Sequence, residues 1–99
     1  MLDKAKDLYK LQKEARAVQK ELKDTEIEAT GADGEVMVVF NGEIHLVDIN
    51  IGEGMLHPDK KRELETVLKK TISEAISRAQ AVAAEKAKSL MGGFKFPGM

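Results

Sequence analysis

The 99-residue sequence has no cysteine and no tryptophan, and only three phenylalanines and one tyrosine. Disulfides and thiolate metal ligands are therefore excluded, which fits a reducing compartment. A core would consist mainly of Val, Ile, Leu and Ala, and small cores of this kind often depend on a partner subunit. No apolar run approaches the roughly 18 residues of a membrane span, and the charged N-terminus has no signal-peptide core. We therefore expect a cytoplasmic protein without a membrane partner.

Lysine and arginine are absent from the middle of the chain. Residues 1–24 carry seven basic and five acidic side chains, residues 25–57 carry none and seven, and residues 58–99 carry nine and five. The middle segment has strand periodicity and the flanking segments have helical periodicity. A surface that binds a polyanion must therefore be built from the helices.

Two long helices are expected, at about residues 2–24 and 58–91. In the first, apolar residues recur at steps of three and four, the spacing of a coiled-coil seam, and Ala5 and Tyr9 widen this stripe. The members of the seam are Leu8, Leu11, Ala15, Val18 and Leu22. In the second helix, Pro58 suits the first position, and Gly92 and Gly93 should end the helix.

Three strands are expected between the helices, at about residues 25–30, 35–41 and 43–51. Glycines at 31 and 34 mark the first turn, and Asn41-Gly42 is typical of a two-residue hairpin, because both residues tolerate positive φ. The sequence thus predicts one α+β domain over residues 1–99, with the order α-β-β-β-α, a three-stranded antiparallel sheet and a short tail at 92–99.

The second helix is too long for a compact domain. It would extend for roughly 50 Å, whereas a domain of this size has a radius of gyration of about 13 Å. Its projecting end still carries an apolar stripe, and such stripes rarely stay exposed. We therefore expect a homodimer in which a second chain covers the stripes. The candidate interface residues are Leu8, Leu11, Val18, Ile72, Ile76, Ala79, Val82 and Ala83.

Several basic clusters are candidates for contact with phosphates. Four lysines follow one stripe of the first helix, and a further basic triplet starts the second helix, against the preference of the helix dipole. The alternative is that neighbouring carboxylates such as Asp7, Glu14, Asp59 and Glu63 neutralise these clusters on a solvated surface. The candidate DNA-contacting residues are Lys6, Lys10, Lys13, Lys20, Lys60, Lys61, Arg62, Lys69, Lys70 and Arg78.

Catalytic and metal-binding patterns are missing from the sequence. His45 and His57 are the only histidines, and the carboxylates near them have no recognised metal-ligand spacing. His45 and Asp48 fall on opposite faces of a strand, which argues against an acid–base pair. We therefore expect no enzyme, no metal and no cofactor.

The order of elements and the turn residues resemble the YbaB/EbfC family of nucleoid-associated proteins. The similarity rests on the charged first helix, on the sequence from Gly34 to Gly42 (GEVMVVFNG), on Val47-Asp48-Ile49, and on the glycine- and phenylalanine-containing segment at 92–98. The resemblance implies a tweezer-shaped homodimer that binds double-stranded DNA on the bacterial chromosome, with weak sequence preference and without catalysis. DNA-repair or replication proteins are further candidate partners.

We therefore expect a nucleoid-located homodimer that contacts DNA phosphates through helical lysines. The alternative is a protein-binding adaptor that acts through its coiled-coil-like helices and its acidic sheet. The net charge of −1 favours the adaptor, whereas the uneven distribution of the basic residues favours DNA.

Overall fold

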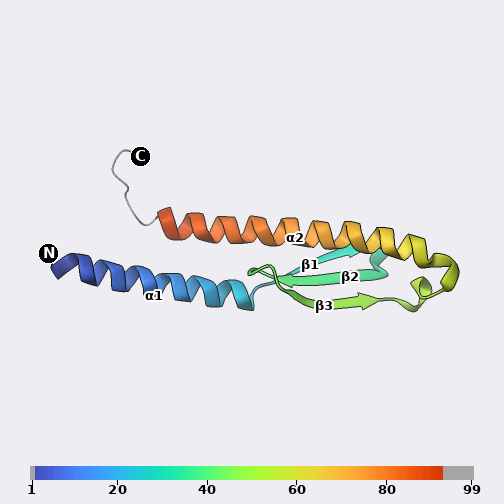
Figure 1. The fold of residues 1–99 in the computed structure, drawn as a ribbon, viewed down its shortest axis with the longest axis horizontal. Coiled ribbons are helices and arrows are strands. Elements are labelled where there is room, and N and C mark those ends of the chain that lie inside the picture. Colours follow the sequence, from blue (N-terminus) through green and yellow to red (C-terminus); the bar gives the residue numbers. More distant parts are fainter. Residues whose placement is uncertain (1, 93–99) are drawn as a thin grey trace.

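The computed structural model describes residues 2–92, so the predicted tail from residue 93 onward lies outside the described part. Helix α1 (Leu2–Asp24) is followed by strands β1 (Glu26–Gly31), β2 (Val36–Asn41) and β3 (Leu46–Ile51) and by the long helix α2 (Lys61–Gly92). This order, seen in Figure 1, confirms the α+β fold and the α-β-β-β-α arrangement. Short 3-10 turns precede β2 and α2.

The three strands form an antiparallel sheet in the order β1-β2-β3. Ala29 lies opposite Val38 in the first pair of strands, and Val38 lies opposite Ile49 in the second. Because the side chains of a strand alternate between faces, the residues in register with Val38 share its face. One face of the central strand is therefore entirely apolar, whereas the outward residues of β1 are Glu26, Glu28 and Thr30.

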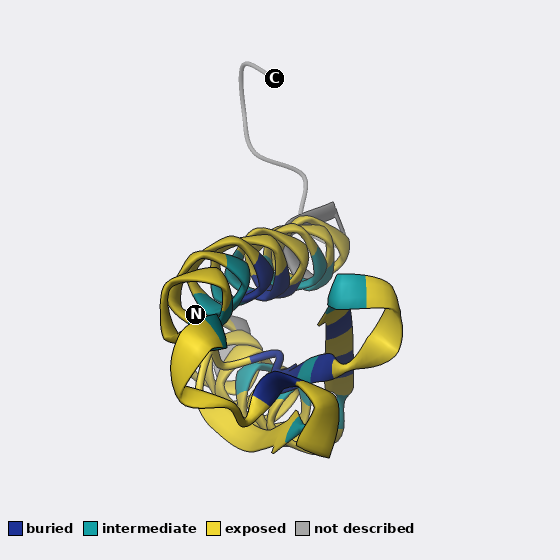
Figure 2. Ribbon diagram, turned by 90° about the vertical axis from the view of Figure 1, so that its right-hand side faces the viewer, coloured by how far each residue is buried: buried dark blue, intermediate teal, exposed yellow. Residues whose placement is uncertain are grey.

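Helix α2 packs on this apolar face through small residues. Ala75 and Ala79 are fully buried, and Thr71 is nearly so, which allows the helix backbone to approach the sheet closely. Figure 2 shows buried residues on α2 and on the strands that face it. The rest of the buried core consists of Ile27, Ala29, Val36, Val38, Phe40 and Met55. At Gly31 an added Cβ would overlap the Thr71 hydroxyl, so β1 also requires its glycine for this close packing.

The hairpin between β2 and β3 differs from the prediction. β3 begins at Leu46 instead of residue 43, and positive φ occurs at Ile44 and not at Asn41 or Gly42. The reason is the Asn41 side chain, whose Oδ1 accepts hydrogen bonds from the backbone N–H groups of Glu43 (2.9 Å) and His45 (3.0 Å). This bonding stabilises a longer loop than the two-residue turn that Asn-Gly usually forms.

Gly42 joins the hairpin to the end of α1. Its N–H lies 2.8 Å from the carbonyl oxygen of Leu22 and 3.1 Å from that of Thr25. An added Cβ would lie 2.8 Å from the Leu22 carbonyl oxygen and 3.0 Å from its Cα. Backbone atoms cannot rotate away as a side chain can. Glycine at this position therefore fixes where α1 leaves the sheet.

Beyond the sheet, α1 and the end of α2 form a projecting helical arm, defined here as residues 2–24 and 80–92 (Figure 1). Lys86 Nζ lies 2.5 Å from Glu21 Oε1, which joins the two helices near the base of the arm. The molecule measures 69 × 25 × 16 Å and has a radius of gyration of 19.3 Å. The prediction that the second helix extends beyond its own sheet is confirmed.

We predict that Gly42→Ala lowers the free energy of unfolding by about 1–3 kcal/mol, because the new methyl group meets the Leu22 backbone. Thermal or urea denaturation measures this effect. Gly54→Ala is the matched control, because its Cβ would meet only the Glu35 side chain, at 3.5 Å or more. Equal stability of the two variants would contradict the role given to Gly42.

Candidate nucleic-acid interface

The face of α1 that is turned away from α2 is basic. At about 100° per residue, five cationic side chains of α1 fall within one arc, opposite the half-buried Ala15, Val18 and Leu22. We call these five residues the basic face: Lys6, Lys10, Lys13, Arg16 and Lys20. All five are exposed. Helix α1 therefore presents its cations on the outer side of the molecule and its apolar stripe on the inner side.

No carboxylate forms an ion pair with the basic face among the described side chains. The two ion pairs found there are Arg78–Glu74 and Lys86–Glu21, and neither includes a residue of the basic face. Glu21, a further carboxylate of α1, is bonded to Lys86 of α2. One carboxylate that could have paired with the basic face is thus engaged elsewhere, and the five cations remain available to an anionic ligand.

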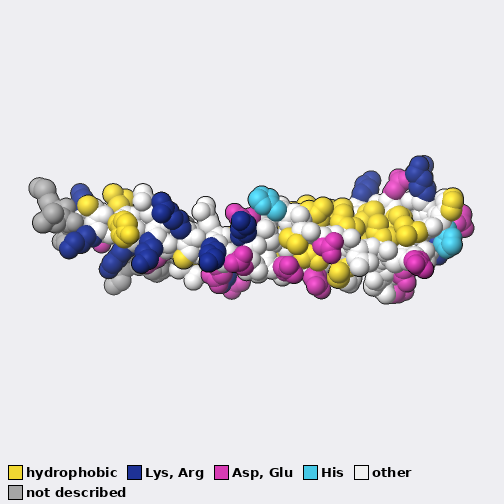
Figure 3. Space-filling view, turned by 90° about the horizontal axis from the view of Figure 1, so that it is seen from below, with side chains coloured by type: hydrophobic (Ala, Val, Ile, Leu, Met, Phe, Trp, Pro, Cys, Tyr) yellow, Lys and Arg dark blue, Asp and Glu magenta, His cyan; other side chains and the backbone are white. Residues whose placement is uncertain are grey.

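Charge is divided between the two ends of the molecule. The arm, residues 2–24 and 80–92, carries nine basic and six acidic side chains, whereas residues 25–79 carry six and eleven. Figure 3 shows the side of the molecule that carries α1 and β3. Basic side chains surround a small apolar group at the arm end, and an apolar patch lies over the sheet end, with acidic side chains along its lower border and Lys or Arg side chains at its upper right. A polyanion is therefore attracted to the arm and repelled by the sheet.

The predicted cluster at the start of α2 lies at the far end of the molecule from the tip of α1 (Figure 1). Lys61 and Arg62 are exposed, and Lys60 is partly buried. The 3-10 turn Pro58–Lys60 occupies two backbone donors, since the Lys60 N–H bonds to His57 and the Lys61 N–H bonds to Pro58. Fewer free N–H groups remain there for a phosphate than the sequence suggested.

Three other candidates lie along α2. Lys69 and Lys70 are exposed where α2 covers the acidic sheet. Arg78 has a structural contact, because its Nη1 donates to the carbonyl oxygen of Glu28 at 2.8 Å and its Nη2 lies 2.7 Å from Glu74 Oε1. Arg78 therefore links α2 to β1, and its guanidinium is already engaged.

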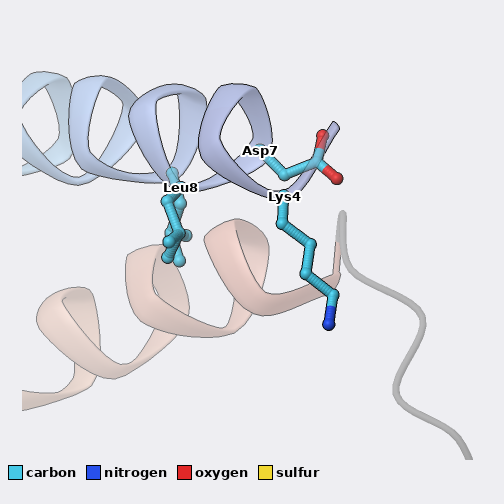
Figure 4. A pocket seen from close by; sticks show the side chains of 4 residues that line it. Lys4, Asp7 and Leu8 are labelled. Atoms are coloured by element: carbon cyan, nitrogen blue, oxygen red, sulfur yellow. The ribbon is translucent and has the colours of Figure 1, made fainter. Parts of the chain in front are cut away.

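The apolar residues expected at a dimer interface fall into two groups. Ala79 is fully buried within the chain, and Ile72, Ile76 and Val82 pack against the same core, while Val18 and Ala83 are half-buried. By contrast, Leu8 is 60% exposed, and with Leu11, Lys4 and Asp7 it lines a hollow of about 320 Å³. Figure 4 shows Leu8 directed toward α2. Because Ala79 is buried and Ile72, Ile76 and Val82 pack against the core, these residues of α2 have little surface left for a second chain.

Two exposed features were missed by sequence reasoning. Tyr9 was placed in the apolar stripe, but it is 69% exposed on the outward side of α1, and its angle on the helix, nearly opposite Val18, could have indicated this. Strand β3 exposes Leu46, Val47 and Ile49, although its alternation suggested one buried face. Alternation cannot reveal whether a neighbouring element covers that face.

Metal-ligand clusters of three or more His, Cys, Asp or Glu side chains do not occur among the described residues. Among residues 2–92, no helix combines the length and the apolarity that crossing a membrane requires.

Comparison with known proteins identifies relatives across nearly the whole chain. A nucleoid-associated protein of Pelotomaculum thermopropionicum is 31% identical over 95% of this chain and 90% of its own length. One of Clostridium novyi is 32% identical over 95% and 82%. The crystal structure of an uncharacterized Helicobacter pylori protein has the same fold, with a TM-score of 0.81, 24% identity and coverage of 89% and 92%.

The family model described as the YbaB/EbfC DNA-binding family matches residues 1–94. The chain belongs to the YbaB/EbfC DNA-binding family.

Proposed function

We propose that this chain binds duplex DNA at the nucleoid as a homodimer, chiefly through phosphate contacts from the basic face of α1. Membership of a DNA-binding family and the names of its relatives support this class of ligand. The observation that carries the proposal is the row of five exposed cations that no described carboxylate pairs with. Release of condensed counterions then provides much of the binding free energy.

The length of the basic face suits a duplex. From Lys6 to Lys20 it extends for about 21 Å, which matches roughly six base-pair steps. Arg16 is the one arginine on this face, and arginine is the side chain that most often reads guanine edges. Lysines that contact phosphates fix position without reading sequence. We therefore propose a weak sequence preference.

The acidic sheet end sets the orientation on DNA. All seven acidic side chains of residues 25–57 are exposed, and none is offset by a cation within that segment. Approach of this end to a phosphate backbone costs electrostatic free energy, whereas approach of the arm is favourable. The arm should therefore contact DNA with the sheet turned away.

We predict that log affinity for a labelled duplex falls linearly with log salt, and that Lys6→Gln/Lys10→Gln makes this slope shallower by about 0.9 for each phosphate that the variant no longer neutralises. Fluorescence anisotropy across a salt series measures both quantities. Lys69→Gln/Lys70→Gln is the matched control, because it removes the same charge over the acidic sheet and should leave the slope nearly unchanged. Equal reductions of affinity in both variants, or binding that ignores salt, would count against the proposal.

Strand β3 is the surface that we propose for the dimer. It is an edge strand with free backbone groups, and Leu46 (51% exposed), Val47 (48%) and Ile49 (40%) lie along it. The opposite edge strand, β1, exposes Glu26 and Glu28, which discourage edge pairing. Two copies related by a twofold axis would bury β3 against its equal.

We predict that the chain sediments at twice its 10.9 kDa mass at micromolar concentration, and that Val47→Glu shifts it to the monomer, because a carboxylate would be buried at the interface. Analytical ultracentrifugation measures this. Thr30→Glu, which adds the same charge at an exposed position of the other edge strand, should leave the dimer intact. A wild-type monomer under these conditions would rule out the β3 dimer.

The adaptor alternative makes a different use of β3. Its apolar patch, which has acidic side chains along one border, would then receive a basic protein in place of a second copy (Figure 3). A monomeric chain whose DNA retention is unchanged by charge reversal at Lys60, Lys61 and Arg62 and by the Lys6→Gln/Lys10→Gln change would favour this alternative.

A further inference from the structure

Tyr9 lies within the basic face of α1. Its neighbours at one-turn spacing are Ala5, Lys6, Gln12 and Lys13. A shallow hollow of about 450 Å³ is lined by Tyr9 together with Ala5, Lys6, Lys10 and Lys13. The phenol is 69% exposed. Figure 3 shows Lys and Arg side chains around a small apolar group at the arm end. A flat aromatic surface is thus presented among cations, with open space above it.

A solvated tyrosine on a helix surface is common and needs no ligand by itself. The surroundings of Tyr9 are more specific. The positions three before, four after and seven after it on the helix are Lys6, Lys13 and Arg16, all cationic, and the position four before is Ala5, whose small side chain leaves one side of the ring open. The described ion pairs include none of these cations.

The combination of an open aromatic ring and unpaired cations matches the chemistry of one ligand class. Single-stranded nucleic acids expose the flat faces of their bases beside their phosphates, and proteins that bind them stack bases on aromatic side chains within a positively charged groove. In a duplex the base faces are already stacked, so an exposed ring meets only edges and phosphates. Tyr9 therefore adds affinity for unpaired bases and little for a duplex.

We propose that the basic face of α1 also binds single-stranded DNA, with an unpaired base stacked on the Tyr9 ring and the flanking phosphates held by Lys6, Lys10 and Lys13. This inference rests on the proposed DNA-binding function and extends it to melted or gapped DNA. The lysines serve both ligands, whereas Tyr9 distinguishes them.

The composition of the chain provides a direct readout. Tyr9 is the only tyrosine and there is no tryptophan, so tyrosine emission comes from this one ring. We predict that an oligo-dT strand quenches this emission at low salt. An abasic oligonucleotide of the same length, which has the same phosphates but no bases, should bind through charge and leave the emission nearly unchanged.

Variants test the same proposal through affinity, measured by anisotropy with labelled oligo-dT and with a labelled duplex. Tyr9→Ala should weaken single-strand binding about tenfold, the effect typical of one stacked base, and should leave duplex binding within twofold. Tyr9→Phe retains the ring and should bind oligo-dT within twofold of the wild type. Leu8→Ala, which changes a side chain directed toward α2 on the same helical turn (Figure 4), should have the same single-strand affinity as the wild type.

The possible outcomes separate the two proposals. The stacking proposal alone would be overturned if the duplex binds in a salt-dependent way, oligo-dT leaves the tyrosine emission unquenched, and Tyr9→Ala and Tyr9→Phe have equal affinity for oligo-dT. Absence of binding to both duplex and single strand at low salt would overturn the DNA-binding function itself. Base-dependent quenching with a selective weakening in Tyr9→Ala would support both.

Discussion

The packing of one continuous helix, α2, on two different partners is the constraint on which the rest of the structure depends. Its N-terminal part, up to Ala79, lies on the sheet through Thr71, Ala75 and Ala79, small side chains that allow close approach. Its second half lies beside α1, where Lys86 bonds to Glu21. Because α2 is unbroken, the arm is held at a fixed place relative to the sheet. The second anchor is Gly42, whose N–H donates to the Leu22 carbonyl oxygen at the end of α1 and whose lack of a side chain allows this close contact.

This architecture keeps opposite charges apart. The Debye length is about 10 Å at 0.1 M salt, whereas the molecule is 69 Å long, so the acidic sheet end has little influence on the tip of the arm. A net charge of −1 therefore says little about the affinity of the arm for a polyanion. The same separation leaves the apolar edge strand β3 at the end away from the basic face. In the proposed arrangement, assembly and DNA contact use different ends of the chain.

Much of the fold was predictable from the sequence, and parts of the site were not. The helices, the three strands and the projecting second helix follow from periodicity and length, because those signals are local. The hairpin was wrong because the Asn41 side chain bonds to two backbone groups and replaces the expected turn. Tyr9 was assigned to the wrong face, and the open surface of β3 was missed, because coverage by other elements is a tertiary property. Arg78 was a candidate for DNA contact by charge alone, but its bond to Glu28 depends on the packing of α2 against β1.

The most direct test of this account is an NMR titration that follows the backbone amide resonances of the protein as duplex DNA is added at low salt. The account predicts that the largest shifts occur in α1, around residues 6–20, and that the resonances of β1 to β3 move little. Shifts concentrated in residues 26–51, with α1 unaffected, would contradict the claim that the basic face of the arm is the DNA-binding surface.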